Sequence, residues 1–339
     1  MDLELSDEQR WLSEAVDTLL AREAEPGRLW ASLVEFGALS VGGEDGLGAV
    51  ELCLIGRALG AHLAPVPYLG SAAARFAAEP LAADLGEDAV GLAVLEPGSS
   101  WGVAPSCTIA GHAVSGRKVA VEYPGAGARL AVVAAAPQGP VLAIVGARAP
   151  GVALVQQPTL DPTVPMCAVE LVDAPIAAEP LGGDTVRRLA TIGALLAAAE
   201  AVGAAGRMLD DACRYAAERR QFGRTIGSFQ ALRHLLADMY VRQASSWSSV
   251  LYAAAALDED AGEAERTVSI AKAYVSRAAR EVAHGAMQVF GGIAVTAEHP
   301  AHRFLRRIVV RERQFGDAAH HERALGRLLA GAAVPAPVG

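Results

Sequence analysis

Hydrophobic and polar positions follow a helical period in the first part of the chain. From residue 6 to about residue 83, apolar residues recur every three to four positions, as on the buried face of an amphipathic helix. Ser6 is placed to cap a first helix, whose expected buried stripe consists of Trp11, Leu12, Ala15, Leu19 and Leu20. A loop is expected at 42–46, followed by a second helix over 49–59 that Gly60 ends. This pattern predicts an N-terminal helical domain over residues 1–88.

The pattern changes to short apolar runs between about residues 89 and 172. Glycine, proline, aspartate and serine separate these runs, as is typical of strands joined by turns. The expected strands are 91–95, 118–121, 130–134, 141–145, 152–155 and 167–172. This spacing predicts a small antiparallel barrel or sandwich, which we place in a middle β domain over residues 89–178.

Helical spacing returns from about residue 184 and continues to residue 332. Helices are expected over 185–219 and 263–290, with a further helix beginning near Pro300 and a double glycine as the stop after 290. Between the first two, Ser228 caps another helix, whose stripe consists of Leu232, Leu235, Leu236, Met239 and Tyr240. The fold class is therefore α+β, with a C-terminal four-helix bundle over residues 179–335.

Composition and charge narrow the classes of function. The chain has 339 residues, of which 52% are hydrophobic, and this is enough to build two or three compact units. Its formal net charge of −9 argues against nucleic acid as a partner, because phosphate binding needs a basic surface. The cysteines are widely separated, so they indicate buried thiols in a reducing compartment and no metal site; they are Cys53, Cys107, Cys167 and Cys213.

Targeting signals are not expected in this sequence. The first eight residues are acidic and lack the layout of a signal peptide. The longest apolar run, 189–199, stops at Glu200 and is shorter than the roughly 20 residues that cross a bilayer. We therefore expect no membrane span and a cytoplasmic protein.

Two motifs in the C-terminal region contain the candidate functional residues. The first reads Glu-Arg-Arg-Gln-Phe-Gly at 218–223 and is followed by Phe229-Gln230. The second reads Gln-Val-Phe-Gly-Gly at 288–292 and is followed by Thr-Ala-Glu-His-Pro at 296–300. Taken singly, an arginine at a helix end and a double glycine after a helix are common structural features. Together and in this order, they resemble the C-terminal domain of the acyl-CoA dehydrogenases.

The resemblance covers most of the chain and implies a cofactor. Segments 30–37, 42–43 and 59–67 are similar to that family's N-terminal helical domain. In the family, the equivalent motifs bind FAD across a subunit interface. The resemblance therefore implies FAD-binding roles for Arg219, Gln221, Phe222, Gln230, Gln288, Gly291 and Gly292. A guanidinium suits the pyrophosphate, and the glycines allow a close approach of the backbone to an extended ligand.

The sequence departs from the family pattern in two places. The family's flavin-lining Thr-Glu-Pro and Gly-Ser-Asp stretch reads Val-Leu-Glu-Pro-Gly-Ser-Ser-Trp-Gly at 94–102, and its Trp-Ile-Thr segment is replaced at 115–121. The catalytic glutamate of the family, which removes the proton α to the thioester, would fall at Gly193 or at Phe315. The catalytic residue is therefore not identified. Glu200, Glu312 and Asp317 lie near these places and are candidates for a displaced base, although a solvated surface charge is the commoner role of such a carboxylate.

Three functional hypotheses follow from the resemblance. In the first, the chain is the accessory subunit of an α2β2 acyl-CoA dehydrogenase of the steroid side-chain type, and a second acyl-CoA dehydrogenase-like chain carries the catalytic glutamate. The second hypothesis is a self-sufficient homo-oligomeric enzyme with a displaced base, and the third is an acyl-CoA-binding or scaffold protein without redox activity. The expected substrate is an acyl-CoA, and an electron-transfer flavoprotein or a similar acceptor would take the electrons.

Overall fold

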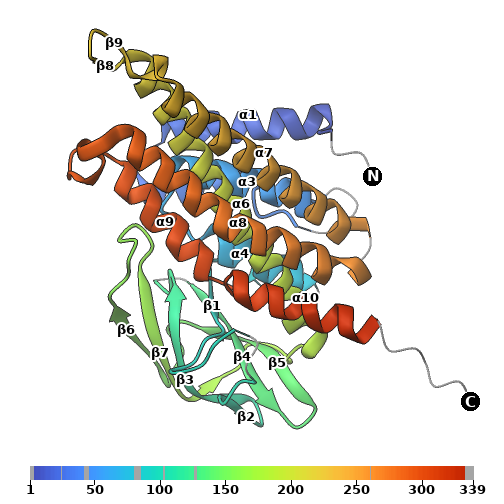
Figure 1. Cartoon of the computed structure of the whole chain (residues 1–339). Coiled ribbons are helices and arrows are strands. Elements are labelled where there is room, and N and C mark those ends of the chain that lie inside the picture. The colour runs from blue at the N-terminus through green and yellow to red at the C-terminus, as the bar shows by residue number, and fades with distance from the viewer. Residues whose placement is uncertain are drawn as a thin grey trace, which may run out of the picture. The chain divides into compact units, whose positions relative to one another are not determined.

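Helices, then strands, then helices succeed one another along the chain, in the order that the sequence predicts (Figure 1). This computed structural model describes residues 4–23, 25–41, 46–79, 85–101, 104–125, 128–259 and 261–332, without the side chains of 261, 331 and 332. Most of the loop expected at 42–46 therefore lies outside the described residues. The chain divides into two compact units: a helical unit of Met1–Ala21, Ala49–Ala64 and Ala194–Gly339, and a sheet unit of Arg22–Gly48 and Pro65–Gly193.

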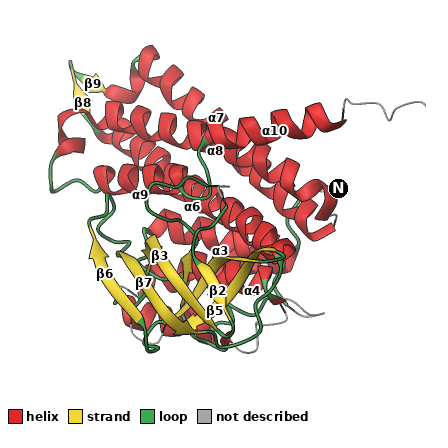
Figure 2. Ribbon diagram, turned by 90° about the horizontal axis from the view of Figure 1, so that it is seen from below, coloured by secondary structure: helices red, strands yellow, loops and turns green. Residues whose placement is uncertain are grey.

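The sheet unit contains a seven-stranded sheet (Figure 2). Its strand order is β1-β4-β2-β3-β7-β6, and β5 pairs with β4. The strands are β1 (Val90–Ala93), β2 (Thr108–Ala110), β3 (Ala113–Glu122), β4 (Arg129–Ala136), β5 (Gly139–Gly146), β6 (Val152–Gln157) and β7 (Met166–Pro175). All six expected strands are present, and among the described residues this sheet has one further strand, the three-residue β2, which was not expected.

The expected antiparallel arrangement is wrong for part of this sheet. Strand β1 runs parallel to β4, with Val90 opposite Arg129 and Ala93 opposite Val132, and the short contact of β2 with β4 is also parallel. A hairpin would require antiparallel pairing, but β2 and β3 intervene between β1 and β4, so the connection between these two strands allows a parallel pair. The other pairs are antiparallel, as expected.

The sheet unit also contains helices α2 (Pro26–Glu35) and α4 (Tyr68–Ala77). Helix α2 begins with a proline, and the Glu25 carboxylate caps it by accepting from two backbone N–H groups. Helix α4 is tied to β1 by the hydroxyl of Ser71, which accepts from Val90 N at 2.9 Å. Buried Arg75 donates to the carbonyls of Gly86 and Asp88, at 2.6 and 2.8 Å. The Arg75 guanidinium therefore fixes the backbone of residues 86 and 88, which lead into β1.

The helical unit contains the predicted helices and one helix that was not predicted, α10. They are α1 (Asp7–Arg22), α3 (Ala49–His62), α6 (Gly183–Glu218, which begins in the sheet unit), α7 (Gln230–Glu259), α8 (Ala261–Phe290), α9 (Ala301–Arg313) and α10 (Ala318–Ala332). Helix α10 was not expected as a separate element. It arises because the chain turns at Phe315 and Gly316, whose φ angles are 58° and 101° and therefore do not continue an α-helix.

The cap predicted for α1 is confirmed, but its buried stripe differs from the prediction. The Ser6 hydroxyl accepts from Gln9 N at 3.2 Å, and the Gln9 side-chain oxygen accepts from Ser6 N at 3.0 Å, which is a reciprocal capping box. The buried residues are Leu12, Val16 and Leu20, at i, i+4 and i+8. Trp11 is 64% exposed, because it lies about 100° around the helix from Leu12.

Two other predicted features of the helical unit are wrong. Ser228 does not cap α7, because its hydroxyl donates back to the Thr225 carbonyl at 2.7 Å, inside a short 3-10 turn, η2 (Ile226–Ser228). Tyr240 does not belong to the buried stripe of α7, since it is 66% exposed whereas Met239 is buried. The end of α8 at Phe290 does agree with the prediction, and Gly291 follows with a φ of +68°.

Gly60 lies inside α3 and does not end it. A Cβ atom at Gly60 would lie 2.0 Å from the carbonyl oxygen of Glu200 on α6, and one at Gly203 would lie 1.8 Å from the carbonyl oxygen of Arg57. The glycines of α3 and α6 therefore allow the two backbones to approach more closely than any side chain permits. This close approach explains why a residue that resembles a stop signal is found within a helix.

We expect Gly60→Ala to destabilise the protein, because the new methyl group meets backbone atoms that move only if α3 and α6 separate. Overpacking of this kind costs about 1–3 kcal/mol or more of the free energy of unfolding. Gly326 on α10 is the matched control: it is an exposed helical glycine with no atom within 4 Å of a Cβ. Gly326→Ala should stabilise by up to about 1 kcal/mol through helix propensity. Urea unfolding measures both, and an unchanged Gly60→Ala midpoint would contradict the packing described.

Helix α6 has the composition of a membrane span but the position of a core helix. In the described residues it is the one helix that is long and apolar enough to cross a bilayer, and 83% of its most apolar window is buried within the protein. Its apolar run 189–199 was expected to form a buried helix, and it does.

Candidate functional site

The first motif forms a tight hairpin at the end of α6. Strands β8 (Arg220–Gln221) and β9 (Arg224–Thr225) pair antiparallel, and Phe222 and Gly223 form the two-residue tip with φ angles of 52° and 78°. Two consecutive positive φ angles are the geometry of a primed hairpin turn, which glycine adopts readily and phenylalanine rarely does. The tip presents Phe222 to the outside with 90% of its surface exposed.

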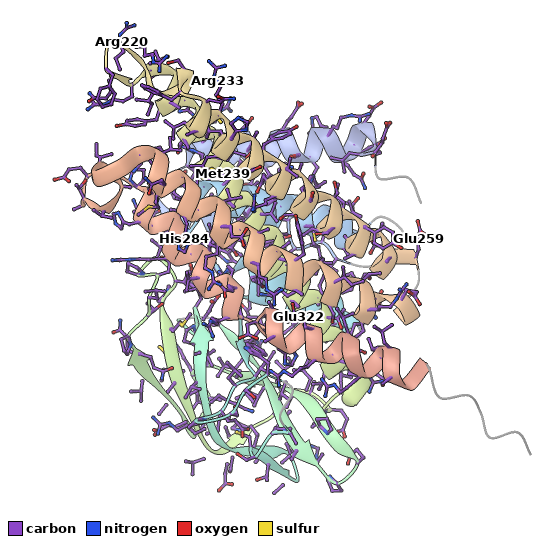
Figure 3. The ribbon with its side chains drawn as sticks, in the orientation of Figure 1. Arg220, Arg233, Met239, Glu259, His284 and Glu322 are labelled. Atoms are coloured by element: carbon purple, nitrogen blue, oxygen red, sulfur yellow. The ribbon has the colours of Figure 1, made fainter. Side chains whose placement is uncertain are left out.

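Aromatic rings and arginines hold the hairpin against the start of α7. The rings of Phe222 and Phe229 meet edge to face at 6.1 Å, and the Arg224 guanidinium lies 4.1 Å from the centre of the Phe229 ring. Arg233 donates to the carbonyls of Gly227 and Ser228, and Figure 3 shows it near Arg220 at this end of the helical unit. The hairpin is therefore a preformed surface that combines positive charge with an exposed ring.

Arg219 lies where the helix ends and the hairpin begins. Its backbone N–H donates to the Tyr215 carbonyl at 2.8 Å, and its own carbonyl accepts from Ile226 N at 2.8 Å. These bonds fix the backbone of Arg219, while its side chain is exposed. Gln221 is also exposed, with its amide donating to the Arg220 carbonyl, and Gln230 is the exposed first residue of α7. The backbone positions of all three are thus set, and their side chains face outward.

The second motif is brought to the same end of the helical unit by aromatic packing. The Phe290 ring, at the end of α8, contacts the Tyr215 ring at 5.5 Å, and Tyr215 lies one turn before Arg219 on α6. The other neighbour of Phe290 is the His299 ring at 4.4 Å. Figure 1 accordingly shows the β8–β9 hairpin and the α8–α9 connection at one end of the helices. Residues about 70 positions apart in the sequence therefore form one surface.

The glycine pair of the second motif leaves room for a ligand. Gly291 and Gly292 begin a 3-10 turn, η3 (Gly291–Val295), and both are exposed. In the described residues no atom lies within 4 Å of the Cβ that a side chain would add at either position. Gln288 is exposed on the last turn of α8. Exposed amide, backbone and guanidinium groups around an open backbone suit an extended, hydrogen-bonding anionic ligand.

The residues at the two places expected for a catalytic glutamate, Gly193 and Phe315, have structural roles. Gly193 is a buried position within α6. Phe315 is 4% exposed, and its carbonyl accepts from the ring Nε2 of His321 at 3.0 Å. Since a carbonyl only accepts, His321 carries its proton on Nε2, and its Nδ1 then accepts from the Ser269 hydroxyl at 3.1 Å.

Glu200 is a buried ion-pair partner and not a displaced base or a solvated surface charge. Its carboxylate accepts from Arg307 and from Arg311, the latter at 2.8 Å, and all three side chains are at least 93% buried. Burial by itself would raise the pKa of Glu200, but the charges of Arg311 and Arg307 outweigh it and hold the pKa below the ordinary value. A carboxylate stabilised as an anion in this way is a poor proton acceptor.

The other two candidate bases also have structural partners. Asp317 caps α10, because its Oδ1 accepts from His320 N at 3.0 Å, and this bond lowers the pKa of Asp317. Glu312 is 7% exposed, and its Oε1 accepts from Arg280 at 3.1 Å. Nearby, the Nζ of buried Lys272 donates to the carbonyls of Arg311 and Glu312 at the end of α9. Burial lowers the pKa of Lys272 to about 7.

The Glu-Pro pair that remains in the sheet unit also has a structural role. The Glu96 carboxylate accepts from Lys118 Nζ at 2.7 Å, from the N–H groups of Ser106 and Cys107, and from the Ser106 hydroxyl. Burial alone would raise the pKa of Glu96, but these donors lower it to about 2. Lys118 is fully buried. The ion pair therefore joins β3 to the segment before β2.

We expect the buried His321 to make the protein sensitive to acid. Burial lowers the pKa of His321 to about 4, from an ordinary value near 6.5. Between these values the unfolded chain binds a proton that the folded chain does not, so stability falls as pH decreases from about 6.5 to 4. The melting temperature of His321→Gln should therefore fall less steeply over this range than that of the wild type. Parallel curves would contradict the buried, neutral state of His321.

Comparison with known proteins decides the family. Residues 182–329 match the C-terminal domain of acyl-CoA dehydrogenases. The chain is also 32% identical over 328 residues to the acyl-CoA dehydrogenase FadE27 of Mycobacterium tuberculosis, which covers 89% of this chain and 88% of FadE27. The chain belongs to the acyl-CoA dehydrogenase family. A second relative, the acyl-CoA dehydrogenase IpdE2 of Mycolicibacterium smegmatis, is 40% identical over 44% of this chain, a segment that spans 45% of IpdE2.

Solved structures of this family share the fold over nearly the whole chain. A chain of the ChsE4–ChsE5 complex from Mycobacterium tuberculosis matches with a TM-score of 0.88 and 29% identity, over 99% of this chain and all of that chain. The Tcur3481–Tcur3483 steroid acyl-CoA dehydrogenase, a G363A variant, also matches with a TM-score of 0.88, at 28% identity over 97% of this chain and 99% of that chain. The predicted fold class of an acyl-CoA dehydrogenase is confirmed.

The structural roles of three arginines were not predicted from the sequence. Arg224 stacks on the Phe229 ring in the hairpin, and Arg307 and Arg311 pair with buried Glu200 in the helical unit. The sequence did contain a signal for Arg307 and Arg311, because a glutamate inside an apolar helix is almost never buried without a partner. Arginines spaced by four residues on α9 offer such a partner from one helix face.

Proposed function

We propose that this chain is the accessory subunit of an acyl-CoA dehydrogenase and completes an FAD site that a second, related chain holds. The assembly would be an α2β2 heterotetramer in the cytoplasm that introduces an α,β double bond into an acyl-CoA. The partner chain would supply the catalytic glutamate. Since a steroid enzyme is among the related structures, we propose a CoA ester of steroid type as the substrate, with an electron-transfer flavoprotein or a similar protein as acceptor.

One contrast carries this proposal. Arg219 of the first motif and Gly291 and Gly292 of the second are exposed at one end of the helical unit. At the two places where the family has its base, the chain has Gly193 and Phe315, and the carboxylate of Glu200 is neutralised by two arginines. A subunit that has the family's FAD-binding motifs but no glutamate at either base position fits a division of labour between two chains.

The residues present fit FAD. Arg219 would pair with the pyrophosphate through its guanidinium, and Gly291 and Gly292 would let their backbone N–H groups approach it. Gln221, Gln230 and Gln288 would donate or accept neutral hydrogen bonds, and the exposed ring of Phe222 would cover an apolar part of the ligand. When bound, FAD supplies the acceptor for the hydride that leaves the β carbon of the acyl group.

Purification of the chain with and without its partner tests the proposal. We expect the chain alone to lack the visible absorbance of bound flavin, and the complex with a co-expressed second acyl-CoA dehydrogenase-like chain to have it together with dehydrogenase activity. An isolated chain that binds flavin and turns over acyl-CoA would support a self-sufficient enzyme instead. A complex that binds acyl-CoA but no flavin would indicate a scaffold without redox activity.

A further inference from the structure

The sequence contains two lysines, and both are buried in the structure. They are Lys118 on β3, in the sheet unit, and Lys272 on α8, in the helical unit. Lys118 is 0% exposed and Lys272 is 1% exposed. A lysine is almost never fully buried unless it is paired. The partners of these two side chains therefore decide whether each can keep its charge inside the protein.

The two lysines differ in their partners. The Nζ atom of Lys118 lies 2.7 Å from a carboxylate oxygen of Glu96, so its charge is compensated by a buried ion pair. The Nζ atom of Lys272 instead donates to the backbone carbonyls of Arg311 and Glu312, at 2.6 and 3.0 Å, and lies 3.5 Å from the hydroxyl oxygen of Ser276. These three partners of Lys272 are neutral. In the described part of the chain, no carboxylate forms an ion pair with Lys272.

The charges around Lys272 do not compensate for its burial. Burial lowers the pKa of Lys272 from about 10.5 to about 7, although the carboxylates of Glu312 and Asp317 act in the opposite direction and only Arg311 adds to the effect. Lys272 is therefore a buried amine that can lose its proton near neutral pH. The titratable groups that face Lys272 or its partners come from α8, α9, the following turn and α10; they are Arg280, Arg311, Glu312, Asp317, His320 and His321.

Lys272 holds a segment in which two unfavourable features coincide. The last carbonyls of a helix lack partners within the helix, and Lys272 supplies a donor to two of them at the end of α9. The chain then turns at Phe315, whose φ of 58° lies in the left-handed region that a bulky residue rarely adopts. Beside this turn, the Oε2 atom of Glu312 is buried and has no hydrogen-bond partner among the described residues. Opening of the turn would relax the backbone and let water reach this carboxylate.

We propose that Lys272 is a pH-sensitive latch on the turn between α9 and α10. In the closed form, Lys272 is a neutral amine that is buried against the end of α9. In the open form, residues 313–317 detach from α8, and water solvates Lys272, which then binds a proton. The open form thus binds more protons than the closed form, so a falling pH favours opening by up to about tenfold for each unit between about pH 10 and 7. Below about pH 7 Lys272 is protonated in both forms, and its effect no longer changes.

The latch is distinct from the other pH-dependent group at this junction. Burial lowers the pKa of His321 to about 4, so His321 acts between about pH 6.5 and 4. Lys272 acts above this range and with the same sign, so that the junction loosens in two successive steps as pH falls. Neither residue belongs to the motifs to which we assign contacts with FAD, and the latch does not depend on the proposed function.

Hydrogen exchange of the full-length protein, measured by mass spectrometry between about pH 7 and 9, tests the latch. A peptide over residues 314–321 contains the hydrogen-bonded amides of Gln314, His320 and His321. After correction for the intrinsic exchange rate, we expect the protection of this peptide to rise with pH by up to about tenfold per unit in the wild type. It should not change with pH in Lys272→Met, which has an apolar side chain of similar length and binds no proton. Circular dichroism checks that this variant is folded.

The peptide that contains Lys118 is the control for a local opening. Lys118 is buried like Lys272 but has a carboxylate partner, so the protection of its peptide should not change with pH. An equal rise in both peptides would overturn the inference, because proton uptake would then unfold the whole chain and not the junction. Equal pH dependence of the peptide 314–321 in the wild type and in Lys272→Met would also overturn it.

Labelling of the two lysines by acetic anhydride gives a second measurement that needs no variant. The reagent modifies only a neutral, accessible amine, so each buried lysine reacts through its opened form. The closed form of Lys272 is already neutral, and its labelling rate should therefore change by no more than about twofold between pH 7 and 9. Lys118 is a cation in its ion pair, so its rate should rise by about tenfold per unit, as that of an ordinary lysine does. An equally steep rise for both lysines would overturn the inference.

Discussion

Replacing Glu200 by glutamine should lower the free energy of unfolding by about 3–5 kcal/mol, which is the usual cost of removing one partner from a buried ion pair. The substitution keeps the size of the side chain but leaves Arg307 and Arg311 buried beside a neutral group. Both arginines lie on α9 and Glu200 lies on α6, so the variant weakens the contact between these helices. Urea unfolding measures the effect.

An exposed pair provides the control for Glu200. Glu263 pairs with Arg266 on the same helix, and both side chains are 50% exposed. Surface pairs of this kind contribute about 0–1 kcal/mol, so Glu263→Gln should leave the unfolding midpoint nearly unchanged. If Glu200→Gln unfolded like the wild type but lost its turnover by about 10²–10⁴, the effect of removing a general base, Glu200 would be a catalytic residue and the accessory-subunit proposal would be wrong.

Replacing Arg219 by alanine should lower the FAD affinity of the assembled complex by about ten- to a hundredfold. A charge-assisted hydrogen bond to a phosphate contributes about 1.5–3 kcal/mol, and each 1.4 kcal/mol is a factor of ten in affinity. The stability of the chain should change little, because the Arg219 side chain is exposed and its structural hydrogen bonds come from the backbone. Flavin absorbance of the complex, titrated with FAD, measures the change.

Arg214 is the matched control for Arg219, since it is an exposed arginine in the last turns of α6, just before Arg219, and pairs with Asp211. Arg214→Ala should leave the FAD affinity unchanged. Equal affinities for wild type and Arg219→Ala would contradict the role proposed for Arg219, and equal losses in both variants would show that general positive charge, and not this position, holds the cofactor.

Much of the fold could be predicted because its elements follow local patterns. The cap at Ser6, the six short apolar runs and the stop at Gly291 each involve neighbours in the sequence. The misses depend on contacts that are distant in the sequence. Strand β1 pairs in parallel with β4, from which β2 and β3 separate it in the sequence, and Gly60 lies within a helix because another helix packs against it.

In the candidate site, too, features set by sequence neighbours could be predicted and features set by distant contacts could not. The hairpin residues 219–223 and the glycines at 291–292 could be found from the sequence because their motifs are contiguous. Their position at one end of the helical unit depends on the contact between Tyr215 and Phe290, which no local pattern indicates. Likewise, Glu200 looked like a candidate base until its pairing with α9, more than 100 residues away, placed it in the core.

The number of flavins per chain distinguishes an accessory subunit from a self-sufficient enzyme. If this chain completes an FAD site on its partner and has no complete site of its own, the purified α2β2 complex should hold one FAD for every two chains. Flavin released from a weighed sample of the complex and counted by absorbance gives this ratio. We expect half as many flavins as chains, and one flavin for every chain would contradict the account.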